Sequence, residues 1–263
     1  MANSSSGDSL LSRLVSILDA FDSHRSSMTI SALSRRVGIP LATTHRLVVQ
    51  LLGERLLERD ADGEVRLGIR LWELASRGSR TTDLREIALP FMEDVQAVVQ
   101  QHTTLSLLDS ENVLYIERLT TRGSAVNITQ IAGRLPIHAC SSGLVLLAYS
   151  PPEFQDDVLG RELVRYTEHT VTEPAALRRL LAGIRQLGHA SVPGIIVPDT
   201  TGIAVPVFER GDRVIAALNV IVPFGEEDLR ATVPALKTAA HGISRALGAD
   251  RPRGGTSRMP RAV

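Results

Sequence analysis

The stretch TISALSRRVGIPLATTHRLVVQLLGE, residues 29–54, decides the fold of the N-terminal part of the chain. We expect one helix over 29–37, because Gly38 suits the left-handed end of a helix. Pro40 suits the first position of a second helix, where its missing N–H is no loss. The pattern predicts a helix–turn–helix.

Charge in this stretch is one-sided. No Asp or Glu occurs from residue 23 to residue 53, whereas four arginines do: Arg25, Arg35, Arg36 and Arg46. Such a surface favours the phosphates of DNA. The alternative is an ordinary helical hairpin whose arginines are solvated.

The second helix has one apolar and one polar face. Leu47, Val48, Leu51 and Leu52 recur at helical spacing and are assigned to the core. The polar face is expected to meet the major groove. We predict DNA contacts from Ala42, Thr43, His45, Arg46 and Gln50 on this helix, and from Arg35 and Arg36 on the helix before it.

The residue types on this face fit distinct parts of a duplex. Arg46 can bond guanine bidentately or clamp a phosphate, and Gln50 can reach adenine. Thr43, near the helix start, suits a phosphate that the helix N–H groups also bind. Arg35 and Arg36 are expected to touch the DNA backbone.

Flanking segments extend the motif into a domain. Apolar residues at helical spacing over 10–21 predict a preceding helix, and 22–28 reads as a polar loop. After the motif, LLERDADGEVRLG predicts a β-hairpin turning at Asp62-Gly63. We expect a disordered segment at 1–9, a winged helix–turn–helix domain at 10–68 and a linker helix at 69–80.

From residue 104 the pattern changes to β-rich runs. These runs are 105–109, 113–119, 124–132, 203–209 and 213–222, with helices expected at 82–101 (interrupted or kinked at Pro90), 141–149, 174–187 (capped by Thr172 and Gly188) and 226–247. They predict an α+β domain over 81–249, an antiparallel sheet with helices packed on it. A basic, disordered tail is expected at 250–263. The 82–101 helix could pair subunits or simply cap this domain.

Composition narrows the class of protein. Hydrophobic content is 43% and the formal net charge is zero, which fits a globular chain with local rather than general basicity. Residues 1–9 lack a signal-peptide pattern, and no apolar run of about 18 residues occurs. We expect a cytoplasmic protein with no membrane span.

The cysteine and histidine pattern argues against a cofactor. Cys140 is the only cysteine, so neither an intrachain disulfide nor a cysteine-based zinc site can form. His102, His169 and His189 lack metal-ligand spacing. We predict no metal and no cofactor.

Cys140 and His138 leave one enzymatic alternative open. They lie two residues apart in HACSSG, so on a strand they would point the same way. A nucleophile beside a base could act in catalysis. No partnering acid motif is evident, and the competing interpretation is a small thiol that lines a ligand pocket.

Four separated motifs, in order, resemble the IclR family of bacterial transcriptional regulators. GIPLATTHRL at 38–47 is similar to the family's recognition helix, and Arg66-Leu67-Gly68 to the end of its wing. GRLPIHACSSGLVLLA at 133–148 is similar to the family's motif in the second domain. IAVPV and ALNVIVP match the closing strand pair.

The resemblance implies a winged helix–turn–helix followed by a GAF-like effector-binding domain. It also implies a homodimer, often paired into a homotetramer, that binds a palindromic double-stranded DNA operator. A small-molecule effector in the second domain would then modulate operator binding.

The expected effector pocket combines a helix start with strand positions. N–H groups at Ser141-Ser142-Gly143 can hold an anion or carbonyl, and small residues on the strands leave space above the sheet. The predicted effector-binding residues are His138, Cys140, Ser141, Ser142, Gly202, Ala204, Asn219 and Ile221.

Several positions depart from the family pattern. Leu144 stands where the family has Lys, Ile195 and Asp199 where it has Glu and Gly, and Asn219 and Ile221 where some members have serines. These changes predict a less polar pocket than in members that bind small carboxylates. Beside the regulator and the enzyme with an accessory winged helix, a scaffold that has lost its ligand is a third hypothesis.

Overall fold

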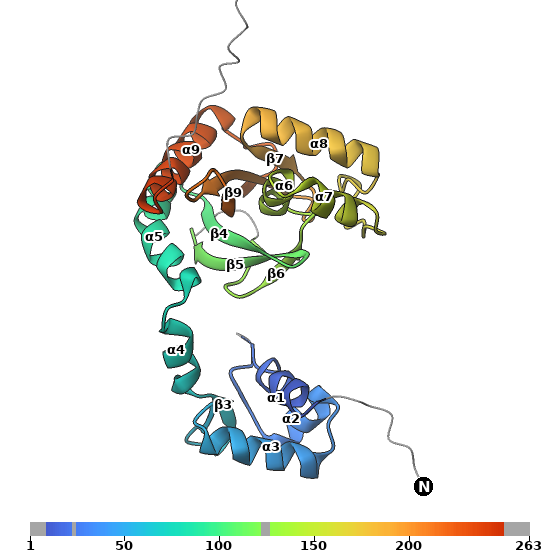
Figure 1. Ribbon diagram of the computed structural model, residues 1–263, viewed down its shortest axis with the longest axis vertical. Helices are drawn as coiled ribbons and strands as arrows, with labels where there is room; N and C mark the ends of the chain where they lie inside the picture. Colours follow the sequence, from blue (N-terminus) through green and yellow to red (C-terminus); the bar gives the residue numbers. More distant parts are fainter. Residues whose placement is uncertain (1–8, 23–24, 122–126, 250–263) are drawn as a thin grey trace, which may run out of the picture. The chain divides into compact units, whose positions relative to one another are not determined.

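The computed structural model describes residues 9–22, 25–121 and 127–249 (Figure 1). The chain divides into two compact units, Met1–Ser79 and Arg80–Val263. The segments expected to be disordered lie outside the described residues, apart from Ser9. Within the described ranges, no helix is both long enough and apolar enough to cross a membrane.

The N-terminal unit is a winged helix–turn–helix. Its elements are α1 (Leu10–Leu18), β1 (Ser27–Met28), α2 (Ile30–Val37), α3 (Leu41–Gly53), β2 (Leu57–Arg59), β3 (Val65–Leu67) and α4 (Ile69–Ser76). The three strands form an antiparallel sheet in the order β1-β3-β2. Ile17, Leu33, Leu47, Leu57 and Val65 are buried together between helices and sheet.

Local signals set the ends of these helices. The Thr29 side chain accepts a hydrogen bond from the N–H of Ala32 and caps α2, and Gly38 ends it at φ +69°. Pro40 is the N-cap of α3 rather than its first residue. The loop expected at 22–28 contains β1, because Ser27 and Met28 pair with β3.

The C-terminal unit is built on one antiparallel sheet of strand order β6-β5-β4-β9-β8-β7. The strands are β4 (His102–Asp109), β5 (Asn112–Leu119), β6 (Arg134–Pro136), β7 (Ala190–Pro193), β8 (Thr200–Phe208) and β9 (Val214–Pro223). The helices are α5 (Arg80–Val99), α6 (Ser141–Ala148), α7 (Pro152–Leu159), α8 (Pro174–Leu187) and α9 (Leu229–Ala246). The chain is therefore α+β, as predicted.

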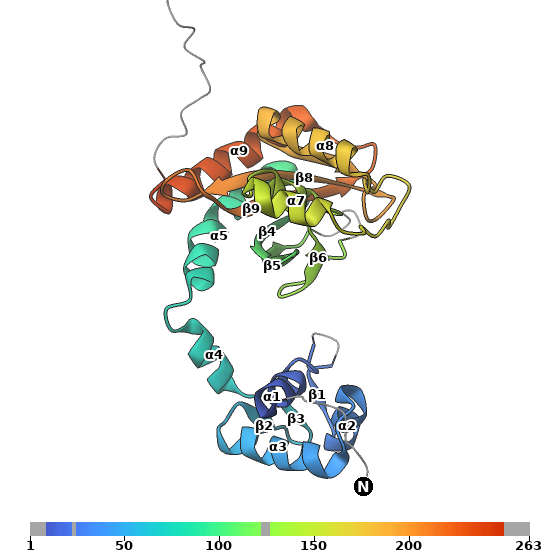
Figure 2. The same ribbon diagram turned by 45° about the vertical axis from the view of Figure 1, so that its right-hand side comes forward.

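Helices cover both faces of this sheet (Figures 1 and 2). Strand alternation separates two cores, since Ile203, Val205 and Val207 pack with α5 and α9, whereas Ala204 and Ala217 pack with α6 and α8. The sheet is thus apolar on both sides, with one core in each layer.

Several sequence expectations for this unit were wrong. No strand forms over 127–132, and the remainder of the 124–132 run lies partly outside the described residues; β6 takes its place beside β5. The helix α7 and the strand β7 were not expected. Glu173, not Thr172, caps α8, because its carboxylate accepts the N–H of Ala176. The helix α5 is not interrupted at Pro90, which lies inside it.

Candidate functional site

One face of α3 is uncovered within the N-terminal unit. Ala42, His45, Arg46 and Gln50 are exposed, and Thr43 is half-buried at the start of the helix. The opposite face buries Leu47, Val48 and Leu51, as the periodicity predicted. The five residues predicted on α3 therefore share a surface available to a duplex.

The turn between α2 and α3 is fixed by two hydroxyls. The carbonyl of Ile39 accepts hydrogen bonds from Ser34 Oγ at 2.7 Å and from Thr44 Oγ1 at 3.1 Å. Thr44 is fully buried, and the sequence reading did not single it out. Because the turn is held from both sides, α3 is presented at a defined angle to α2.

The arginines of this surface are not equivalent. Arg36 forms an ion pair with Asp22, Nη2 to Oδ2 at 2.9 Å, so part of its charge is already neutralised. Arg35 and Arg46 are exposed, and within the described part of the chain neither forms an ion pair. Arg46 therefore combines a free guanidinium with a place on the exposed face of α3.

The wing has an acidic tip. Asp60 Oδ1 accepts the N–H groups of Asp62 and Glu64, which folds the turn, while Arg59 Nη1 donates to the carbonyl of Gly63. Arg66 is paired with Glu58 at 2.7 Å. The carboxylates of Asp60, Asp62 and Glu64 carry the same sign of charge as DNA phosphates, which disfavours phosphate contact at the tip.

A narrow cavity of about 40 Å³ lies in the C-terminal unit between the start of α6 and the sheet. Of the predicted effector residues, Cys140, Ser141, Gly202, Asn219 and Ile221 line it. The lining includes no charged side chain among the described residues. Ile195 and Ile221, which differ from the family pattern, thus make their parts of the wall apolar.

A chain of hydrogen bonds runs through the wall of this cavity. Ser141 Oγ donates to Asn219 Oδ1 at 2.8 Å, and Asn219 Nδ2 donates to Thr104 Oγ1 at 3.0 Å. All three residues are buried. The bonds fix the orientation of the Asn219 amide, which keeps its remaining hydrogen-bonding capacity for a ligand.

Gly202 makes close approach of α6 and β8 possible. A Cβ added at this position would lie 2.5 Å from Ser141 Oγ and 3.1 Å from Ser141 Cβ. The backbone conformation of Gly202 is ordinary, so glycine is needed here for space rather than for flexibility.

Three predicted effector residues lie outside the cavity lining. His138 Nε2 is within 2.9 Å of the carbonyl oxygen of Val164, and the ring packs near Tyr166. Ser142 is buried on the first turn of α6, and Ala204 is packed in the core beneath it. His138 and Cys140 do not face a common site because 137–140 is a turn and not a strand.

The sequence reading missed much of the lining. Apolar walls that were not predicted come from Tyr115, Ile128, Leu135, Val192, Ile196 and Val197, and Thr129 and Thr200 add hydroxyls. Alternation along β5 could have indicated Tyr115. Ile195 was noted only as a departure from the family pattern. Its neighbours Ile196 and Val197 gave no signal, because the loop that holds them is placed by the long-range β7–β8 pairing.

The chemistry of Cys140 argues against nucleophilic catalysis. Burial raises the pKa of the thiol to about 11, and its Sγ accepts the N–H of Gly143 at 3.3 Å. The thiol caps α6 and packs beside Tyr115. Within the described residues, no cluster of side chains suited to bind a metal ion is found.

Alkylation tests this description of Cys140. With a pKa of about 11, roughly one thiol in a thousand is ionised at pH 8, so iodoacetamide should label the native protein very slowly. Unfolded in urea, the same thiol should react at the rate of a free cysteine. Fast labelling of the native protein would contradict this description and show that Cys140 is a reactive thiol.

Comparison with known proteins agrees with both units. The sequence model of the bacterial transcriptional regulator IclR C-terminal domain matches residues 79–245, and that of the IclR helix-turn-helix domain matches residues 10–61. The chain belongs to the IclR family. As in that family, it is a transcriptional regulator with a DNA-binding helix–turn–helix and a C-terminal effector-binding domain.

Individual IclR-family relatives align over most of the chain. The HTH-type transcriptional regulator KdgR of Escherichia coli (strain K12) is 30% identical over 241 residues, which is 90% of this chain and 91% of KdgR. XynR of the same organism is 29% identical, over 90% of this chain and 96% of XynR.

A solved relative contains a small aromatic acid. The crystal structure of an IclR homolog complexed with 4-hydroxybenzoate from Microbacterium hydrocarbonoxydans is 45% identical, with a TM-score of 0.87. The match covers 91% of this chain and 99% of that homolog.

Proposed function

We propose that this IclR-family regulator binds a palindromic operator through α2 and α3 and changes its operator affinity when a hydroxylated aromatic acid enters the α6 cavity. The observation that carries the proposal is the hydrogen-bonded pair Ser141–Asn219, which Thr104 anchors from behind, in the wall of an uncharged and largely apolar cavity. The predicted DNA contacts remain Arg35, Arg36, Ala42, Thr43, His45, Arg46 and Gln50.

The residues that line the cavity have the chemistry to bind one aromatic ring with polar ends. Ile195, Ile196 and Ile221 offer flat apolar contact, and the Ser141 and Asn219 side chains offer hydrogen bonds. A carboxylate has no cationic partner in the described lining, so it would rest on N–H groups at the start of α6. The 4-hydroxybenzoate of the homolog belongs to this chemical class.

The size of the cavity links binding to movement. About 40 Å³ accommodates only a few water molecules, which is less than a ring requires. Entry of the effector therefore displaces lining side chains around α6. A ligand that favours the displaced state shifts operator affinity, typically by about 1–3 kcal/mol of coupling.

Exposed apolar side chains support self-association as a homodimer or homotetramer. Leu10 and Leu11 on α1, and Ile69, Trp72 and Leu74 on α4, are exposed in the N-terminal unit. Trp72 is 67% exposed, which is unusual for the largest apolar side chain. A second copy covering these faces would present two α3 helices to a two-fold operator.

The enzymatic alternative has less support. The relatives are transcriptional regulators, and Cys140 and His138 are each engaged elsewhere. We infer a cytoplasmic regulator without catalytic activity.

The direct test is operator selection with the purified full-length chain, followed by titration of 4-hydroxybenzoate and related acids into the complex. A change in operator affinity on addition of one such acid supports the proposal. Sequence-independent DNA binding would contradict the operator part, and unchanged affinity with every aromatic acid would contradict the effector part.

Gly202→Ala should reduce the effector response. The new methyl group overlaps Ser141 Oγ and fills the cavity, so the acid concentration needed for half the response should rise about tenfold or more. Fluorescence anisotropy of a labelled operator measures this shift. Gly183→Ala on α8, where an added Cβ meets nothing within 4 Å, is the matched control.

A further inference from the structure

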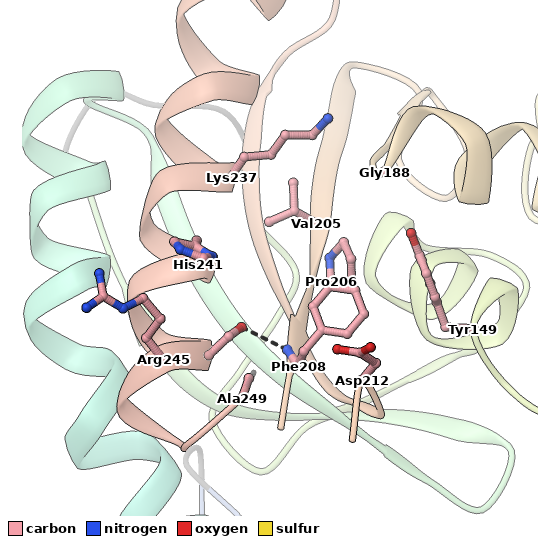
Figure 3. A pocket seen from close by; sticks show the side chains of 11 residues that line it. Tyr149, Gly188, Val205, Pro206, Phe208, Asp212, Lys237, His241, Arg245 and Ala249 are labelled. Atoms are coloured by element: carbon pink, nitrogen blue, oxygen red, sulfur yellow. Dashed lines mark hydrogen bonds between the residues drawn. The ribbon is translucent and has the colours of Figure 1, made fainter. Parts of the chain in front are cut away.

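A second, larger cavity lies at the free edge of β8 in the C-terminal unit. Its volume is about 240 Å³, against about 40 Å³ for the α6 cavity, and the two share no lining residue. It is bounded by α9, β8 and the ends of α6 and α8 (Figure 3). The proposed effector function leaves this space unassigned.

The edge is open because β7 is short. β7 pairs with β8 only from Thr201 to Ala204. Further along, Pro206 has no N–H to offer a neighbouring strand, and the N–H of Phe208 is taken by Ser244 Oγ at 2.9 Å. Side chains from α9 therefore stand opposite the edge where another strand would otherwise pair.

The walls of this cavity are apolar. Val205, Pro206 and Phe208 form one side, and the Tyr149 ring meets Phe208 edge to face, with centroids 5.7 Å apart. The half-buried rings of Phe208 and Tyr149 suit contact with a flat ring.

The two ends of the cavity carry opposite charges. Lys237 extends from α9 toward Gly188, and its Nζ donates to the carbonyl of Leu187 at 2.7 Å, which leaves two further N–H donors. Asp212 lies at the far end beside Phe208 (Figure 3). Arg245 turns its guanidinium away toward α5, and His241 lies on the α9 wall.

We propose that this cavity is a second small-molecule site, which binds an aromatic carboxylate with a hydroxyl group at the opposite end of the ring. The carboxylate accepts from Lys237 Nζ, the ring lies against Phe208 and Tyr149, and the hydroxyl donates to Asp212. The segment that follows Ala249 carries four arginines. Its positive charge makes it a poor occupant of a cavity that has a lysine at one end.

The probe for this site is 3-(4-hydroxyphenyl)propanoate, titrated into full-length protein labelled with ¹⁵N-phenylalanine. The chain has five phenylalanines, so the spectrum is simple, and the Phe208 N–H faces this cavity and not the α6 cavity. We expect its signal to move and saturate. This readout does not depend on operator binding, so its failure is separate from failure of the proposed function.

Matched variants test the two ends. Lys237→Gln loses the charge but can still donate to Leu187, and should weaken binding about tenfold. Arg230→Met removes a charge from the same helix at an exposed position outside the cavity lining, and should leave binding unchanged. Asp212→Asn should reduce the preference for the probe over 3-phenylpropanoate.

A Phe208 signal that does not move with the probe would overturn the proposal, as would equal effects of Lys237→Gln and Arg230→Met. Thermal melting of each variant checks that the fold is kept. If Lys237→Gln melts early, Asp212→Asn on the exposed turn still decides whether the hydroxyl end is recognised.

Discussion

Replacing Arg46 with alanine is expected to lower operator affinity by about ten- to a hundredfold, since one well-placed arginine contact contributes about 1–3 kcal/mol. Arg46 is exposed on α3 and forms no ion pair with any described residue, so its full charge is available to the duplex. Anisotropy titration against the selected operator measures the loss.

The salt dependence of binding distinguishes the two roles of Arg46. If the guanidinium clamps a phosphate, the slope of log affinity against log salt should fall by about 1, and binding should weaken on all sequences. If it bonds guanine, specificity at one base pair should relax instead. Either outcome places Arg46 in the interface.

Arg13→Ala is the matched control, because it removes the same charge from α1. Unchanged affinity and an unchanged salt slope in Arg46→Ala would remove Arg46 from the interface. Equal losses in both variants would mean that only the net charge of the unit matters.

The N-terminal unit could be predicted from the sequence because its signals are local. Gly38 at φ +69° and the Thr29 cap are properties of a few neighbouring residues. The Asp62-Gly63 turn likewise brings together strands that are adjacent in sequence. The two-residue strand β1 was missed because pairing with β3, far along the chain, is what makes it a strand.

In the C-terminal unit, the wrong predictions concern elements that depend on contacts between residues far apart in sequence. β4 pairs with β9 more than a hundred residues later, and β7 is a strand only because β8 lies beside it. The apolar run at 124–132 has the composition of a strand, but β6 holds the place beside β5. Composition alone could not decide between them.

In the candidate effector site, too, residues indicated by local spacing were predicted and residues brought in by long-range contacts were not. Ser141 at a helix start, and Asn219 and Ile221 on one face of a strand, follow from spacing and do line the cavity. His138 was placed there by assuming a strand, and the turn at 137–140 directs it to Val164 instead. Tyr115 and Ile195 line the cavity because tertiary packing brings them there.

Gly143→Ala is expected to destabilise the C-terminal unit by about 3 kcal/mol, because overpacking against fixed backbone cannot be relieved by a rotamer change. A Cβ at Gly143 would overlap the carbonyl oxygen of Ile137 and lie 2.7 Å from its Cα. Gly143 is buried on the first turn of α6, and its N–H donates to Cys140 Sγ. A shift of the α6 N-terminus that relieves the overlap also moves Ser141, which donates to Asn219.

Urea unfolding of the full-length chain measures this effect in each unit separately. Trp72 is the only tryptophan and lies in the N-terminal unit, so its fluorescence follows that unit, while far-UV circular dichroism follows both. Gly143→Ala should lower the circular dichroism midpoint and leave the Trp72 transition in place.

Gly183→Ala on α8 is the matched control for this measurement. Its added Cβ meets nothing within 4 Å, and alanine in a helix interior should raise the free energy of unfolding by about 0.5–1 kcal/mol. If Gly143→Ala stabilised the chain as Gly183→Ala does, the close approach of α6 to Ile137 would be wrong. The position of the α6 N-terminus over the effector cavity would then be wrong as well.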